Sequence, residues 1–220
     1  PVLDLGGGTG VWANPIAAEG RPVVLGDIAP GMLARAREKL QARGLLERVT
    51  FEELDVCDLS RFPDKSFSLV MALGDPLSYC TDAAQALREM RRVVKDNGIL
   101  IADVENRYAG LDERRAPTLN DALEILTTGL SKAVEQAPDL EPIRLFLPGE
   151  IGPLLKETQW QPAALFGSDL FIAFLRPEIL DELKVASPDF ERAVALEEIL
   201  RADLHTIGVG YEIQFVARAL

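Results

Sequence analysis

Histidine, cysteine and long apolar runs are scarce in this sequence, and each scarcity excludes something. The 220 residues include one histidine and two cysteines. Cys57 and Cys80 form neither a CxxC motif nor a metal-ligand spacing, and His205 cannot complete a zinc site with them. We therefore expect no metal, and cysteines outside a disulfide framework suit the reducing cytoplasm. No apolar run reaches membrane-spanning length and no signal peptide is visible, so we predict a cytoplasmic protein without a membrane partner.

Basic residues are also few. Lysine and arginine total 23 against 35 aspartates and glutamates, which gives a formal net charge of −12. The basic residues are scattered along helix-like segments and form no stripe that would neutralise phosphates. A nucleic-acid substrate is therefore disfavoured, whereas a small molecule or a protein stays open as substrate.

What the sequence does contain is an alternation of apolar strands with amphipathic helices. Five apolar runs predict buried strands, at 1–5, 22–27, 49–55, 67–73 and 99–104. Pro30 opens a helix with Leu33, Ala36 and Leu40 on one face, and we expect Thr81 to cap another. The alternation predicts an α/β fold in one domain over residues 1–220, with a doubly wound, mostly parallel sheet. Because Pro1 already lies in a strand-like run, we expect further residues upstream of it.

The second half of the chain is less regular. We expect helices at about 119–136, 148–158 and 187–200, and a strand near 163–166. The closing stretch GYEIQFVARAL alternates apolar Ile213 and Phe215 with polar Glu212 and Gln214, which indicates a strand with one polar face. We interpret this strand as an antiparallel edge of the sheet.

A glycine-rich stretch, LDLGGGTG at 3–10, stands between the first strand and the first helix. A ligand that approaches backbone amides at a helix N-terminus needs such glycines, because any Cβ would block it. The dinucleotide-binding pattern GxGxxG is only partly met, since Gly6 and Gly8 fit its first two glycines and Val11 occupies the third. The third glycine comes one residue early, at Gly10.

The stretch DLGGGTG, in which Asp4 precedes Gly6 by two residues, resembles the first motif of class I S-adenosylmethionine-dependent methyltransferases that act on small molecules. Asp27 ends the second strand, seventeen residues after Gly10, where an acid can accept both ribose hydroxyls. Four further stretches are similar to the family and follow in its order: IAPGMLARAREK (28–39), LDVCDL (54–59), RFPDKSFSLV (61–70) and ALGDPLSY (72–79). The resemblance covers about residues 2–105 and implies a Rossmann-like, seven-stranded sheet whose last strand is reversed.

The resemblance implies S-adenosylmethionine as cofactor and S-adenosylhomocysteine as product. The implied cofactor contacts are Asp4, Gly6, Gly8, Gly10, Asp27, Ile28, Asp55, Val56 and Leu73. The glycines would let the methionine portion and ribose lie against the backbone, Asp4 would orient the amino end, and Asp27 would hold the ribose. Ile28 would pack on adenine, Asp55 and the Val56 amide would bind its edge, and the Leu73 carbonyl would face the cofactor ammonium. Asp58 is a rival for the role of Asp55, and Asp4 could instead only cap backbone amides.

The sequence names no catalytic residue. Methyl transfer depends on holding the attacking atom in line with the methyl carbon, and no general base stands out. His205 reads as a surface or capping histidine, and both cysteines read as inert fillers. Candidate substrate contacts follow the fourth and fifth strands and comprise Asp75, Tyr79, Glu105, Arg107 and Tyr108. Arg107 suits a carboxylate or phosphate, although a local salt bridge explains it equally well.

Two stretches exceed what the minimal fold requires, at about 106–148 and 170–207. We expect both to emerge above the cofactor and to form a helical cap. We expect Leu119, Leu123, Leu126 and Leu130 to give the first insertion a buried face, which could cover the pocket or form a homodimer. A covered pocket suits a small-molecule methyl acceptor.

Two alternatives stay open at this stage. A nicotinamide-dependent oxidoreductase shares Asp27, but it leaves Val11, Asp55 and the final strand unexplained. A non-catalytic module that only binds S-adenosylmethionine is compatible with the absence of an evident general base. The identity of the methyl acceptor and of the attacking atom cannot be read from the sequence.

Overall fold

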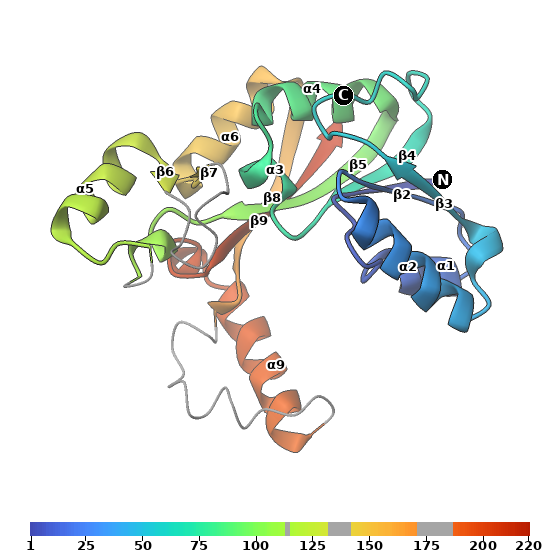
Figure 1. The fold of residues 1–220 in the computed structure, drawn as a ribbon. Helices are drawn as coiled ribbons and strands as arrows, with labels where there is room; N and C mark the ends of the chain where they lie inside the picture. Colours follow the sequence, from blue (N-terminus) through green and yellow to red (C-terminus); the bar gives the residue numbers. More distant parts are fainter. Residues whose placement is uncertain (113–114, 132–141, 171–186) are drawn as a thin grey trace. The chain divides into compact units, whose positions relative to one another are not determined.

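The computed structural model describes residues 1–112, 115–131, 142–170 and 187–220, and a seven-stranded sheet is its central element (Figure 1). The strands are β1 (Val2–Leu5), β2 (Val23–Asp27), β3 (Val49–Glu53), β4 (Phe67–Ala72), β5 (Val94–Glu105), β8 (Trp160–Ser168) and β9 (Glu212–Ala219). Their order in the sheet is β3-β2-β1-β4-β5-β9-β8. The strands from β3 to β5 pair in parallel, and one strand of the sheet is reversed, so the predicted fold class is confirmed.

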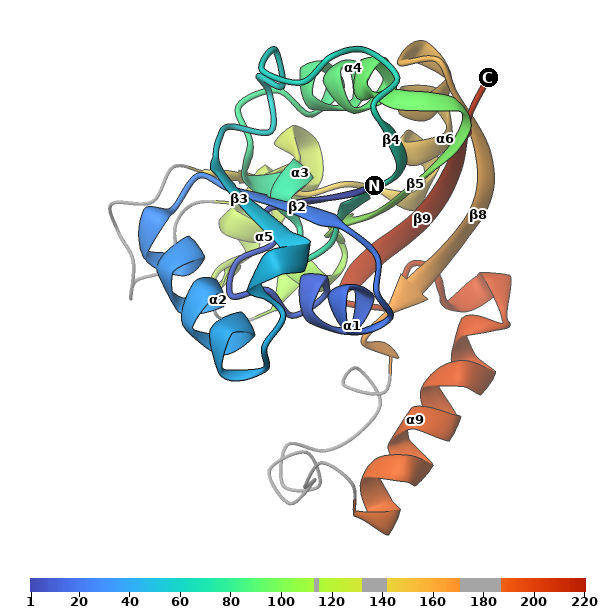
Figure 2. The same ribbon diagram turned by 90° about the vertical axis from the view of Figure 1, so that its right-hand side faces the viewer.

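Helices cover both faces of this sheet, as Figure 2 shows, with α1 and α2 on one side and α4 and α6 on the other. The helices are α1 (Ala13–Ala18), α2 (Pro30–Ala42), α3 (Pro76–Tyr79), α4 (Ala83–Val93), α5 (Leu119–Thr128), α6 (Pro148–Glu157) and α9 (Pro188–Arg201). The predicted face of α2, formed by Leu33, Ala36 and Leu40, is buried in a core cluster with Val23 and Leu25 of β2. This packing is what the 3.6-residue spacing of the apolar positions dictates.

Helix α4 packs on the second face of the sheet, and its N-cap lies one residue later than predicted. Asp82, and not Thr81, is the N-cap, because its side chain accepts the amide of Gln85 at 3.0 Å. Leu87 of α4 is fully buried, and its carbonyl accepts the indole N–H of Trp160 in β8 at 3.1 Å. These contacts hold β8, at one edge of the sheet, against α4.

The prediction that the last strand is a sheet edge is wrong. β9 lies between β5 and β8, and β8 is the edge strand. The alternation along β9 does bury Ile213 and Phe215 and leaves Glu212 and Gln214 partly exposed. A polar face reports only what lies above and below a strand, whereas an edge is defined by its backbone neighbours.

The predicted helix over 119–136 also ends too late. Thr118 and Asp121 form a capping box at the start of α5, and the helix ends at Thr128 because Gly129 takes the left-handed conformation, with φ 72°. Short strands follow, β6 (Leu130–Ser131) and β7 (Ile143–Arg144), which pair antiparallel. Residues 132–136 of the predicted helix lie outside the described residues.

The chain divides into two compact units. The first comprises Pro1–Asp103, Gly152–Ala163 and Phe215–Leu220, and the second comprises Val104–Ile151 and Ala164–Gln214. The second unit thus contains both segments that we expected as cap insertions, 106–148 and 170–207, although residues 171–186 are not described. Among the described residues, no helix is both long and apolar enough to cross a membrane.

The prediction that the first insertion has a buried leucine face is wrong for the described residues, because the leucines of α5 and Leu130 of β6 are exposed. Leu119 and Leu123 are 89% and 61% exposed, and Leu126 and Leu130 are about half exposed. Ile125 is the buried residue of the helix. The described part of the chain therefore leaves this face accessible to a partner.

Candidate functional site

A cavity of about 220 Å³ opens in the first unit, where several parallel strands reach their carboxyl ends. Open α/β sheets bind ligands at this edge. The lining residues are Gly6, Asp27, Ile28, Leu54, Asp55, Val56, Gly74, Pro76, Tyr79 and Cys80. The cavity thus gathers Gly6, Asp27, Ile28, Asp55 and Val56, which the sequence analysis assigned to the cofactor. It also includes Tyr79, which was assigned to the substrate.

The glycine loop is shaped by backbone conformations that only glycine adopts without strain. Gly6 and Gly8 have φ values of 64° and 53°. A Cβ at Gly6 would also lie 2.8 Å from the Cβ of Pro76, which is too close for any real contact. At Gly8 the space is open, so its positive φ alone requires glycine.

Asp27 fixes this loop from the end of β2. Its Oδ2 accepts the amide of Gly8 and its Oδ1 accepts the amide of Ala29, both at 2.8 Å. Each carboxylate oxygen keeps a further lone pair, and the side chain lines the cavity. Asp27 therefore holds the glycine loop in place and retains the capacity to accept two ligand hydroxyls.

Asp4 lies fully buried beneath the glycine loop, and a Cβ at Gly7 would approach its Oδ2 to 3.0 Å. Burial raises the pKa of Asp4 to about 7, the negative charge of Asp27 adds to the rise, and the amide of Ala13 opposes it. No donor among the described residues meets hydrogen-bond geometry at either oxygen. A buried carboxylate in this state is a fitting partner for a cationic or hydrogen-bonding group of a ligand.

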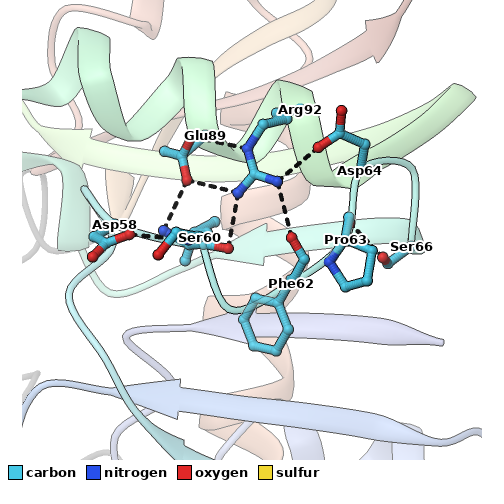
Figure 3. A network of polar contacts seen from close by, with 9 residues as sticks. Asp58, Ser60, Phe62, Pro63, Asp64, Ser66, Glu89 and Arg92 are labelled. Carbon is cyan, nitrogen blue, oxygen red and sulfur yellow. Dashed lines mark hydrogen bonds and ion pairs between the residues drawn. The ribbon is translucent and has the colours of Figure 1, made fainter.

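The two rivals Asp55 and Asp58 differ in position. Both are exposed, and each accepts a backbone amide two residues ahead, from Cys57 at 2.8 Å and from Ser60 at 3.0 Å. Asp55 lines the cavity, whereas Asp58 does not. Hydrogen bonds from the side chain and amide of Ser60 lower the pKa of Asp58, and Figure 3 shows Asp58 beside Ser60.

Arg92 organises the segment that follows the cavity wall (Figure 3). Its guanidinium binds the carboxylates of Glu89 and Asp64 at 2.8 Å, and it donates to the carbonyls of Leu59 and Phe62 at 2.8 and 2.9 Å. These hydrogen bonds hold the pKa of Glu89 below its usual range. In the sequence Arg92 looked like one of many surface charges, so this role was missed.

The loop after β4 depends on Asp103, another residue that the sequence analysis missed. Gly74 and Asp75 both have positive φ, 88° and 62°, and both amides donate to Oδ1 of Asp103, at 2.9 and 2.8 Å. Successive amides that converge on one oxygen form an anion-binding nest. Asp103 thus shapes the wall to which Gly74 belongs, and Leu73 just before it is buried.

The substrate candidates Glu105, Arg107 and Tyr108 belong to the second unit, and two of them form ion pairs within it. Arg107 is buried, donates to the carbonyl of Leu145 at 3.0 Å and binds both carboxylate oxygens of Glu150 at 2.9 Å. Arg107 thus forms the salt bridge that the sequence left open as an alternative, and its role in holding a substrate anion stays a prediction. Glu105 forms a two-pronged ion pair with Arg115, at 2.8 and 2.9 Å. Tyr108 is half exposed.

The histidine and the cysteines differ in accessibility. The His205 side chain is 96% exposed and lies 2.8 Å from Asp203, as a surface histidine would. Burial raises the pKa of Cys80 to about 12, so this thiol stays protonated at neutral pH. Cys80 nevertheless lines the cavity, which its reading as a filler did not predict.

Comparison with known proteins now gives this geometry a context. Residues 2–98 match the family model described as a methyltransferase domain. A ubiquinone/menaquinone biosynthesis C-methyltransferase, UbiE, of Pseudoalteromonas translucida is 40% identical over 104 residues, which are 46% of this chain and 40% of that protein. The chain thus spans less than half the length of this curated relative.

Solved structures match over almost the whole chain. An S-adenosylmethionine-dependent methyltransferase of Mesorhizobium loti has a TM-score of 0.67 at 20% identity and covers 99% of this chain and 89% of its own. The 4+2 cyclase SpnF has a TM-score of 0.64 at 20% identity and covers 99% of this chain and 74% of its own. At these identities the matches show the shared fold.

Proposed function

We propose that this protein methylates a small molecule. The premises are that residues 2–98 match the methyltransferase-domain family and that the chain has the class I S-adenosylmethionine-dependent methyltransferase fold. S-adenosylmethionine is the cofactor and S-adenosylhomocysteine the product. The family match and the C-methyltransferase relative support this interpretation over a nicotinamide-dependent oxidoreductase.

The observation that carries the proposal is how the carboxylate of Asp27 is held at the cavity. The Gly8 and Ala29 amides fix its carboxylate at the cavity, with a lone pair of each oxygen left for the two hydroxyls of a ribose. Ile28 and Tyr79 add exposed apolar surface to the cavity for a purine, and Asp55 adds an acceptor for its amino group. Asp4 beneath the loop suits the positively charged end of the cofactor.

When bound, the cofactor supplies a methyl group made electrophilic by its sulfonium. The chain contributes orientation: Asp27 and the glycine loop hold the nucleoside, so that an acceptor atom can be brought in line with the methyl carbon. Leu73 offers its backbone carbonyl. Gly10 closes the loop, because its backbone N–H donates a hydrogen bond to the Gly7 carbonyl at 2.8 Å. We assign no general base, and Asp75, Glu105 and Tyr108 stay candidate substrate contacts.

Calorimetry with S-adenosylhomocysteine tests the cofactor site, and Asp55 and Asp58 supply a matched pair. Each is exposed and forms the same turn, so Asp55→Ala and Asp58→Ala lose equivalent backbone contacts. We expect about tenfold weaker binding for Asp55→Ala, or about 1.4 kcal/mol, because only Asp55 faces the cavity. Asp58→Ala should bind within about twofold of wild type. Equal affinities for the two variants would contradict the assignment.

A second candidate is a protein that binds the cofactor without transferring its methyl group. It stays a candidate because we assign no general base to the chain. Incubation of a metabolite mixture with methyl-labelled S-adenosylmethionine separates the two functions. Labelled product supports the methyltransferase, and tight cofactor binding without any labelled product supports the second candidate.

The finer expectations on assembly and location belong to the same proposal. We place the protein in the cytoplasm, where the two free thiols would stay reduced. The exposed leucines of α5 fit a homodimer contact, since Leu119 and Leu123 lie one turn apart on one face. A small-molecule acceptor and a second copy of the chain are thus the proposed partners.

A further inference from the structure

Cys57 and Cys80 lie on two different loops of the first unit that meet beside the cavity. Cys57 follows β3, two residues after Asp55, and Cys80 follows α3. The Thr81 hydroxyl donates to the Cys57 sulfur at 3.7 Å, and the Cys57 thiol donates to the Asp82 carbonyl at 3.5 Å. The Cys57 sulfur therefore lies against the two residues that come directly after Cys80.

Cys57 also affects the pKa of Cys80. Burial is the main cause of the raised pKa of Cys80, and both the charge of Cys57 and a hydrogen bond to it add to the rise. Both cysteines are reduced and partly exposed, and they are the only cysteines of the sequence. Two partly exposed thiols on adjoining loops, one of which lines a ligand cavity, are suited to oxidation.

We propose that Cys57 and Cys80 are an oxidisable pair, which a peroxide converts into a disulfide that ties two walls of the cavity together and weakens nucleoside binding. The first half of the proposal concerns the thiols alone. The second half rests on the proposed function, because it takes the cavity to be the nucleoside site.

The chemistry balances with hydrogen peroxide as the oxidant. The Cys57 thiolate attacks one peroxide oxygen, the O–O bond breaks, and the released hydroxide takes a proton to leave as water. The Cys80 sulfur then attacks the sulfur of the Cys57 sulfenic acid, the S–O bond breaks, and a second water leaves with the Cys80 proton. Two thiols are oxidised by two electrons, and one peroxide is reduced to two waters.

The assignment of Cys57 as the attacking thiol follows from its surroundings. Its sulfur is partly exposed and accepts a hydrogen bond from the Thr81 hydroxyl, so a peroxide can reach it from solvent. Cys80 donates to the carbonyl of Leu77 at 3.5 Å and, with its pKa raised to about 12, stays a thiol until the sulfenic acid forms. Cys80 therefore suits the resolving step.

The cross-link would act on the cavity directly. Asp55 and Val56, directly before Cys57, line the cavity, and so do Tyr79 and Cys80 from the second loop. A bond between the sulfurs would draw these loops together and remove the freedom of both to accept a purine. Reduction by a dithiol would restore the open cavity, since thiol–disulfide exchange is reversible.

The first experiment follows the covalent change. The 220-residue chain is treated with a small excess of hydrogen peroxide, and intact mass and peptide mapping identify the product. We expect the loss of two hydrogen atoms, one peptide pair linked through Cys57 and Cys80, and no such product in Cys57→Ser. A disulfide between two chains, or oxidation of Cys57 to its sulfinic acid without cross-linking, would overturn the pair.

The second experiment measures binding of S-adenosylhomocysteine to reduced, oxidised and re-reduced protein. We expect at least tenfold weaker binding after oxidation, full recovery after dithiothreitol, and unchanged affinity of Cys57→Ser under all three conditions. A cross-linked protein that binds as well as the reduced protein would refute the effect on the cavity. If the reduced protein does not bind at all, the proposed function fails, while the mass data still decide the disulfide.

Discussion

Two buried aspartates in neighbouring strands have opposite surroundings. Asp27 in β2 receives backbone amides on both oxygens, while Asp4 in β1 meets no donor in hydrogen-bond geometry within the described residues. The sequence placed both at the cofactor but could not distinguish them, because the difference depends on where the amides of Gly8 and Ala29 point. The two aspartates therefore have different roles. Asp27 holds the glycine loop through two hydrogen bonds, and Asp4 keeps both oxygens available to a ligand donor.

The state of Asp4 predicts how stability depends on pH. Burial raises its pKa from 3.8 to about 7, so between these values the folded chain holds a proton that the unfolded chain releases. The free energy of unfolding therefore falls as the pH rises through this window and levels off above it. Relative to Asp4→Asn, the free energy of unfolding of the wild type should fall by up to about 4 kcal/mol between about pH 4 and pH 8. Urea unfolding measures this, and parallel pH profiles of the two proteins would refute it.

Asp103 predicts a positioning effect on the cavity. Asp103→Ala leaves the Gly74 and Asp75 amides without their shared acceptor, so we expect about 1–3 kcal/mol lower stability. Binding of S-adenosylhomocysteine should weaken about tenfold, since Gly74 lines the cavity. Asp103→Asn keeps an acceptor oxygen and should recover most of the binding. Calorimetry on both variants tests the role, and equal loss in both would argue for the charge instead.

At the scale of elements, the sequence predicts what depends on local pattern. The glycine loop after β1, the buried face of α2 and the start of α9 near residue 187 follow from residues close in the chain. The position of β9 inside the sheet was not predicted, because alternation along one strand says nothing about its lateral neighbours. The end of α5 was missed because Gly129 was not recognised as a stop after a leucine-rich stripe.

The Arg92 network predicts a stabilising contact that a similar surface pair lacks. Arg92–Glu89 and Arg192–Asp189 are both i,i+3 pairs on helices, but only Arg92 also holds Asp64 and two loop carbonyls. We expect Arg92→Lys to lower the free energy of unfolding by about 1–3 kcal/mol, because an ammonium cannot make these forked bonds.

Arg192→Lys is the control for this prediction. The Arg192 and Asp189 side chains are 78% and 72% exposed, so the substitution should change stability by less than about 0.5 kcal/mol. Urea unfolding of both variants gives the comparison. Similar losses for Arg92→Lys and Arg192→Lys would show that the loop contacts add nothing.

At the scale of the whole molecule, the two compact units differ in how much the sequence revealed. The first unit contains the cavity and the stretch that matches the methyltransferase family, so its strands and several cavity-lining residues could be predicted from motifs. The second unit begins near residue 104, where the motifs end. Its Arg107–Glu150 and Glu105–Arg115 pairs join residues 43 and 10 positions apart, and the sequence pattern did not indicate these partners.

The apolar face of α5 predicts a dimer. We expect light scattering to report twice the mass of the chain, and Leu119→Lys/Leu123→Lys to reduce it to the mass of one chain by placing charges in the contact. Ile199→Lys is the matched control, because Ile199 of α9 is 71% exposed and equally apolar. A monomeric wild type, or dissociation by the control alone, would contradict this interface.

The carboxylate of Asp27 has one more consequence, for the rate of association. Because it already clamps the amides of Gly8 and Ala29, the turn around Gly6 is assembled before any nucleoside arrives. A nucleoside that binds then loses its own translational and rotational freedom but orders few residues of the protein, so the entropic cost of binding is small. Stopped-flow traces should accordingly be single-phase, with an observed rate that climbs linearly with nucleoside concentration and reaches no plateau.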